Sequence, residues 1–149
     1  MAYDAQVNSL EKQWMPFTDN RGFKADPRLI TEAKGVYMTS HRGTQIVDGS
    51  SGLFCSPAGH CHPKIIEAVH EQLKINTYTA PFGLGHPASF ALADQVAQLT
   101  PEGMNHVFFV NSGSEAIDTA LKMVMSYHSA RGENRHRFVS RERAYHGVN

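Results

Sequence analysis

The sequence predicts an α/β fold, and three patterns in the chain of 149 residues support this prediction. Residues 106–110 form a short apolar run, residues 114–130 repeat apolar side chains at helical spacing, and residues 137–140 form a second strand-like run. Strand, helix and strand at this spacing predict a βαβ unit with parallel strands and a right-handed crossover.

The N-terminal part of the chain predicts one short helix and three strands. Asn8 suits the cap of a helix over residues 8–14, which must end before Pro16 because the residue preceding a proline avoids the helical conformation. Short turns then separate strand-like segments at 29–33, 36–39 and 44–47. These connections favour a small antiparallel meander.

Two helices and two loops are predicted between this meander and the apolar run. Residues 63–74 and residues 87–99 each begin with a proline, which suits the first helical position, and each repeats apolar side chains on one face. The loops at 48–59 and 77–85 also contain apolar side chains. A loop as long as residues 48–59 that carries buried-type side chains is more often functional than idle.

Composition narrows the possible partners. The net charge is zero with neutral histidines, so neither nucleic acid nor an anionic membrane is expected as a partner. No apolar run is long enough to cross a bilayer and no signal peptide is visible, so a cytoplasmic protein is expected. Because two parallel strands would leave both sheet edges open, we expect the chain to be the opening part of a larger α/β protein.

Cysteine and histidine do not predict a metal site. Cys55 and Cys61 are too few for a disulfide framework. Residues 60–62 (HCH) carry ligand-type side chains, but adjacent residues rarely converge on one ion and no second ligand pair stands at the usual spacing. We expect a turn ahead of a helix there.

Residues 111–116 (NSGSEA) say most about function. A strand that turns into a helix leaves backbone N–H groups unpaired at the positive end of the helix dipole, which is a ready phosphate site. Gly113 lets an anion approach closely, and the hydroxyls of Ser112 and Ser114 can donate hydrogen bonds. The same residues also fit a capping box, in which Glu115 reaches back to Ser112 at the N-cap, and many such helices bind nothing.

Five segments, in order along the chain, resemble the class III aminotransferases, which use pyridoxal phosphate. They are residues 14–18 (WMPFT), 48–55 (DGSSGLFC), 85–87 (GHP), 109–116 (FVNSGSEA) and 145–147 (YHG). The omega-amino acid:pyruvate (beta-alanine:pyruvate) branch is the most similar. The resemblance implies an incomplete fold-type I pyridoxal phosphate enzyme. Residues 1–58 would be an N-terminal segment with the meander, and residues 59–149 the start of the large domain.

The resemblance also implies how the cofactor is held. Ser112, Gly113 and Ser114 would bind its phosphate, and Tyr145 would stack on the pyridine ring, which fixes the plane of the ring. Without the resemblance, Tyr145 would be taken for an ordinary half-buried tyrosine.

Three phenylalanines match positions that line the substrate pocket in this family: Phe17, Phe54 and Phe82. Phe82 would act across a homodimer, in the site of the neighbouring subunit. Plain core packing is the alternative for each side chain. The branch usually carries a tryptophan where this sequence has Phe54, so pocket size and amine preference stay open.

Pyridoxal chemistry needs a Schiff-base lysine and an acidic partner for the pyridinium nitrogen. In the family both lie downstream of the YHG segment, and none of the six lysines of this chain stands at the Schiff-base position. No catalytic residue is therefore predicted within residues 1–149, and we expect this segment to be inactive alone. The complete enzyme would move an amino group from an omega-amino acid or amine to pyruvate.

Other functions stay open on the sequence alone. Within the class, the alternatives are relatives that act on 4-aminobutyrate, ornithine or other amines, and aminomutases. A non-catalytic binding module or a degenerate relative is a further alternative.

Overall fold

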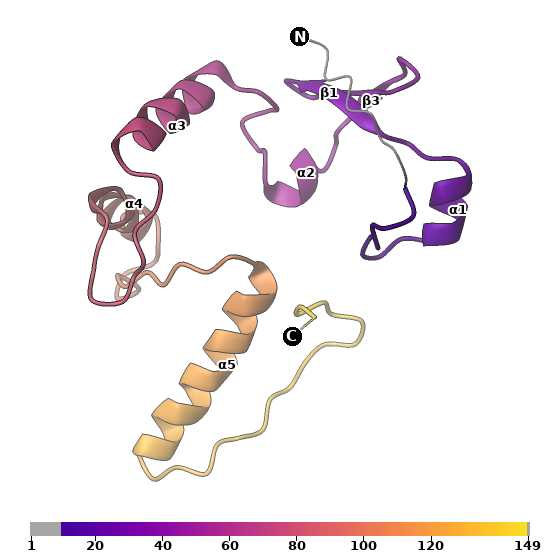
Figure 1. Ribbon diagram of the computed structural model, residues 1–149. Helices are drawn as coiled ribbons and strands as arrows, with labels where there is room; N and C mark the ends of the chain where they lie inside the picture. Colours follow the sequence, from indigo (N-terminus) through magenta and orange to yellow (C-terminus); the bar gives the residue numbers. More distant parts are fainter. Residues whose placement is uncertain (1–9, 149) are drawn as a thin grey trace. The chain divides into compact units, whose positions relative to one another are not determined.

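The computed structural model describes residues 10–148 (Figure 1). The chain divides into two units by its internal contacts. The first unit, Met1–Tyr78, contains α1 (Asn20–Ala25), β1 (Ile30–Lys34), β2 (Tyr37–Ser40), β3 (Gln45–Val47), α2 (Ser51–Phe54) and α3 (Pro63–Ile75). The second unit, Thr79–Asn149, contains α4 (Pro87–Ala97) and α5 (Gly113–Ala130). The predicted division into domains after residue 58 stays a prediction.

The three strands form the predicted antiparallel meander in the order β1-β2-β3, with Met38 of the central strand opposite Ala33 on one side and Ile46 on the other. Ser40 organises the second turn. Its carbonyl accepts the N–H of Gly43 at 2.8 Å, and its Oγ accepts the N–H of Thr44 at 3.2 Å. Ser40 is buried, at 6% exposed, and these local hydrogen bonds satisfy its polar groups.

The first helix was predicted at the wrong place. Residues 8 and 9 lie outside the described part of the chain, and residues 10–14 are not helical. The helix is α1, which follows Asp19, whose Oδ1 accepts the N–H of Gly22 at 3.2 Å. A short isolated helix is marginal in water, and this side-chain cap stabilises α1.

The two proline-led helices match their predicted ranges closely. Pro63 and Pro87 lie in the first turns of α3 and α4, as predicted. The α4 helix also has a side-chain cap, because Nδ1 of His86 accepts the N–H of Ala88 at 3.1 Å. Within residues 10–148, no helix has both the length and the apolar character that a membrane span requires.

The α5 helix also forms as predicted, but the two strands predicted beside it do not. Residues 106–110 and 137–140 have no strand assignment in the described chain, and no backbone hydrogen bond joins the two segments. A strand is stabilised by a ladder of hydrogen bonds to a neighbouring strand. Apolar sequence alone does not supply that ladder.

Candidate functional site at the N-terminus of the α5 helix

The first turn of α5 is built by two side chains that precede or begin the helix. Ser112 is the N-cap, and its Oγ accepts the N–H of Glu115 at 3.2 Å, as predicted. The carboxylate of Glu115, however, accepts from Asn111 instead of Ser112, at 2.9 Å from the backbone N and 3.2 Å from Nδ2. This bond holds the residue ahead of the cap and so fixes the direction in which the chain enters the helix.

This turn offers several hydrogen-bond donors to an anion. Among the described residues, the backbone N–H groups of Gly113 and Ser114 have no acceptor. A Cβ built on Gly113 would meet no atom within 4 Å, so the space in front of the turn is open. The Oγ atoms of Ser112 and Ser114 each accept one N–H, from Glu115 and Val148, which leaves their hydroxyl protons free to donate.

The charge of the helix adds to these donors. The α5 helix is 18 residues long, and its N-terminus carries roughly half a positive charge from aligned peptide dipoles. Open space, unpaired amides, two hydroxyls and this partial charge together fit a phosphate group.

The segment after α5 returns to this same turn (Figure 1). The N–H of Val148 donates to Oγ of Ser114 at 3.2 Å, and a Cβ built on Gly147 would lie only 2.7 Å from Cα of Ser114. Gly147 also has a φ of +119°, a conformation that suits glycine. Residues 145–147 are thereby brought to the first turn of α5, and Tyr145 is 72% exposed, so its ring is accessible.

His146 is held by a separate contact. Its Nε2 lies 2.8 Å from Oγ of Ser140, which ties the turn to the segment that leads into it. The YHG motif is thus anchored on both sides, through Ser140 before it and through Ser114 after it.

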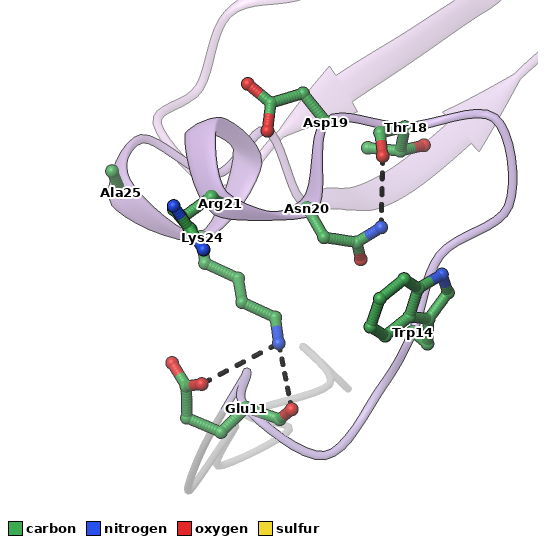
Figure 2. Close-up of a pocket in the computed structure, with 8 residues that line it drawn as sticks. All are labelled: Glu11, Trp14, Thr18, Asp19, Asn20, Arg21, Lys24 and Ala25. Atoms are coloured by element: carbon green, nitrogen blue, oxygen red, sulfur yellow. Dashed lines mark hydrogen bonds and ion pairs between the residues drawn. The ribbon is translucent and has the colours of Figure 1, made fainter.

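Phe17 lies in a loop that Asn20 holds in place. The side chain of Asn20 accepts the N–H of Met15 at 2.8 Å and donates to the carbonyl oxygen of Met15 at 2.9 Å. It also donates to the carbonyl oxygen of Thr18 at 3.0 Å (Figure 2). Phe17 itself has a φ of +49°, which is rare outside glycine, and its side chain is 87% exposed. No sequence pattern predicted this role for Asn20, because the role depends on how the loop folds back.

Phe54 and Phe82 are both 88% exposed, so neither is packed in a core in the described structure. Phe54 follows the meander in the first unit, and Phe82 belongs to the second unit. The roles predicted for these two side chains, and for Phe17, remain predictions.

A hollow of about 670 Å³ lies against α1 in the first unit (Figure 2). It is lined by Glu11, Trp14, Thr18, Asp19, Asn20, Arg21, Lys24 and Ala25. Nζ of Lys24 donates to the carbonyl oxygen of Glu11 at 2.8 Å and lies 3.7 Å from its carboxylate. Lys24, the lysine that lines this hollow, is therefore already paired with Glu11.

The HCH segment, residues 60–62, contacts the loop that precedes it. Nε2 of His60 lies 2.8 Å from Oδ2 of Asp48, and Cys61, like Cys55, is an exposed free thiol. Within residues 10–148, no three histidine, cysteine or acidic side chains are grouped so that they could hold a metal ion.

Comparison with known proteins places these features in one family. A sequence profile described as aminotransferase class-III matches residues 20–149. An omega-aminotransferase from Caulobacter vibrioides is 46% identical over 146 residues, which are 97% of this chain and 33% of that protein. An omega-amino acid–pyruvate aminotransferase from Pseudomonas putida is 45% identical, over 94% of this chain and 31% of that protein.

Solved structures agree with the sequence matches. An (S)-enantioselective omega-transaminase from Thermomicrobium roseum superposes with a TM-score of 0.88 at 28% identity, over 99% of this chain and 34% of that one. The omega-transaminase of Pseudomonas jessenii in complex with PMP also superposes with a TM-score of 0.88, at 31% identity. The match covers 94% of this chain and 32% of that one. The predicted α/β class, an incomplete fold-type I domain, is confirmed.

The chain spans about a third of the length of the relatives it matches. Within that third, the sequence identity, the fold and the order of the motifs all match aminotransferases. The chain belongs to the class III aminotransferases.

Proposed function

We propose that the protein carrying this chain is a pyridoxal-phosphate-dependent transaminase that moves an amino group from an omega-amino acid or amine to pyruvate. The observation that carries the proposal is the first turn of α5, where the N–H groups of Gly113 and Ser114 have no acceptor in the described chain and a Cβ on Gly113 would meet no atom within 4 Å. Relatives named for omega-amino acid and beta-alanine substrates, at 44–46% identity, support the choice of branch.

The residues present fit the cofactor that this family uses. Gly113 and Ser114 would bind its phosphate through backbone amides, with the hydroxyls of Ser112 and Ser114 as further donors, and Tyr145 would lie against its ring. When bound, pyridoxal phosphate supplies an electron sink for amino-group transfer. The contribution of this chain is to orient the cofactor and to exclude competing positions of its phosphate.

Residues 1–149 alone would not perform this reaction in our proposal. About three charge-assisted hydrogen bonds to phosphate, at roughly 1.5–3 kcal/mol each, are offset by an association cost of about 4–15 kcal/mol. The six lysines of the chain do not stand where the family forms its covalent link. Lys74 and Lys122 are also already paired, with Glu71 at 2.6 Å and Asp118 at 2.5 Å.

The substrate pocket and the assembly follow from the family. Phe17 and Phe54 would line the pocket for the amine, and Phe82 would complete the pocket of the second subunit in a homodimer. Their exposure in the described structure leaves all three side chains available for such contacts.

The test is a transamination assay on the purified protein that carries this chain. We expect alanine to form from beta-alanine and pyruvate when pyridoxal phosphate is supplied, at a rate well above that of cofactor without protein. If no amine donor yields alanine while the cofactor still binds, a non-catalytic relative is the better assignment. If 4-aminobutyrate or ornithine reacts with another keto acid instead, the assignment moves within the class.

A further inference from the structure

Residues 48–60 form a loop whose two ends are tied to the turn between β1 and β2. The N–H of Asp48 donates to the carbonyl oxygen of Val36 at 2.9 Å. Gly35 and His60 exchange two backbone hydrogen bonds, of 3.0 and 2.8 Å. The loop is thus closed by backbone contacts, and its middle part is free to take a conformation of its own.

The middle of the loop, α2, is a left-handed turn. Four consecutive residues have positive φ: Ser51 at 52°, Gly52 at 58°, Leu53 at 55° and Phe54 at 70°. Side chains other than glycine are disfavoured in this region, and such strain persists only where the surroundings over-determine it. The turn closes through the N–H of Phe54, which donates to the carbonyl oxygen of Ser50 at 3.1 Å.

The carboxylate of Asp48 supplies the restraint. Its Oδ1 accepts from the backbone N of Ser50 at 3.1 Å and from the hydroxyl of Ser50 at 3.0 Å. Its Oδ2 accepts from the backbone N of Gly52 at 2.7 Å and lies 2.8 Å from Nε2 of His60. The Asp48 side chain is only 5% exposed, and both of its carboxylate oxygens contact residues of the loop.

His60 joins the left-handed turn to the closed end of the loop. Its backbone is fixed by Gly35 and its ring, 22% exposed, contacts the same carboxylate oxygen that holds Gly52. The hydrogen bond from His60 also lowers the pKa of Asp48 below its usual 3.8, which favours the charged carboxylate. The turn and the sheet are therefore connected through one hydrogen-bonded pair.

We infer that Asp48 and His60 are positioning residues that lock the left-handed turn and so fix where Leu53 and Phe54 present their side chains. These two side chains are open to solvent, at 77% and 88% exposed. The consequence for amine selectivity rests on the proposed function, in which Phe54 lines the substrate pocket. The lock itself does not depend on that function.

The lock is tested by hydrogen exchange on the purified protein that carries this chain. Asp48→Asn cannot accept from both Ser50 and Gly52 and still satisfy His60, so we expect the amides of residues 50–54 to exchange about tenfold faster or more. His60→Leu should have the same local effect, and His60→Gln, which keeps a donor, should stay near wild type. Asp26→Asn is the matched control, because Asp26 is an exposed carboxylate outside this loop that pairs with Arg42, at 2.5 Å.

A second variant keeps the test informative if Asp48→Asn fails to fold. Gly52→Ala leaves Asp48 and His60 intact, but its φ of +58° disfavours a side chain and its Cβ would lie 3.2 Å from Oγ of Ser56. We expect it to loosen residues 50–54 as Asp48→Asn does. Unchanged exchange in Asp48→Asn, or in His60→Leu where Asp48→Asn fails to fold, would overturn the lock. Unchanged exchange in Gly52→Ala would show that residues 50–54 do not depend on the left-handed backbone.

Kinetics then test the link to selectivity. We expect Asp48→Asn and His60→Leu to raise KM for a bulky arylalkyl amine more than for beta-alanine, with a smaller change in kcat, whereas His60→Gln and Asp26→Asn leave both constants near wild type. Faster exchange with an unchanged ratio of KM values would overturn the positioning role toward substrate. A wild-type protein that fails to transaminate would refute the proposed function and leave the exchange result as the test of the lock.

Discussion

Gly147 joins the fold to the proposed cofactor site at the scale of a single residue. It combines a positive φ of +119° with an approach to Ser114 that leaves no room for a Cβ, since that atom would lie 2.7 Å from Cα. Any side chain here would push the YHG segment away from the first turn of α5. Tyr145, two residues earlier, would move with it.

We predict that Gly147→Ala weakens pyridoxal phosphate binding by about tenfold or more, because steric displacement of this size costs on the order of 1–3 kcal/mol. Cofactor titration followed by absorbance measures the effect. Gly103→Ala is the matched control, because Gly103 also has positive φ, at +85°, but a Cβ there would meet no atom within 4 Å. Equal affinities of the two variants would contradict the steric account.

Glu133 gives a second test at the residue scale. Its carboxylate accepts from Nε of Arg131 at 2.8 Å and contacts Nδ1 of His128 at 2.8 Å, at the end of α5. The guanidinium of Arg131, followed by His128, lowers the pKa of Glu133 below its usual 4.5. Because the pKa of Glu133 is lower in the folded state than in the unfolded state, its carboxylate stabilises the folded state above pH 4.5. This contribution is lost as the pH falls through the pKa of Glu133 in the folded state.

We therefore expect a carboxyl carbon NMR titration of Glu133 to have its midpoint below 4.5. In Arg131→Gln the midpoint should rise toward 4.5, and the helix end should fray at a higher pH than in wild type. A midpoint that does not move in this variant would show that Arg131 is not the principal cause of the shift.

At the scale of elements, helices were predicted more accurately than strands. The ranges of α3, α4 and α5 follow from prolines, caps and apolar periodicity, which are all contained within each helix. The strands predicted at 106–110 and 137–140 failed because strand formation depends on partners outside the segment.

The site shows the same limit. The cap at Ser112 was predictable because it lies three residues from Glu115, the N–H of which it accepts. The role of Asp48 was not, because the side chain of His60 that completes it is 12 residues away. An aspartate in a loop is a signal for the hydrogen bonds that Asp48 accepts from Ser50, but not for the left-handed residues that follow.

The N-cap of α5 gives the prediction at this scale. Ser112→Ala should destabilise the helix by about 1 kcal/mol, within a range of roughly 0.5–2, because the N–H of Glu115 loses its acceptor. Urea unfolding of the protein measures this change. Ser126→Ala, in the interior of the same helix, should be neutral or slightly stabilising. A loss of stability in Ser126→Ala as large as in Ser112→Ala would contradict a capping role.

At the scale of the whole molecule, the described residues expose their apolar faces. No apolar side chain within residues 10–148 is fully buried. The apolar face of α3 is typical, because its four large side chains are each 51–54% exposed: Ile65, Ile66, Val69 and Leu73. Large exposed apolar patches mark surfaces that bind other protein. A polypeptide limited to residues 1–149 should therefore self-associate as its concentration rises.

Sedimentation velocity checks this expectation. Val69→Glu places a charge in the apolar face of α3 and should weaken association, whereas Glu67→Gln should not. A polypeptide of these residues that stays monomeric over a wide concentration range would show that the faces are covered within the chain itself.

The central claim is that main-chain amides around Gly113 bind the cofactor phosphate. The most direct measurement is a crystal structure of the protein that carries this chain, grown with pyridoxal phosphate. We predict phosphate oxygens within hydrogen-bond distance of the N–H groups of Gly113 and Ser114, with the ring of Tyr145 against the pyridine. A phosphate bound elsewhere, with these amides facing solvent, would contradict the account.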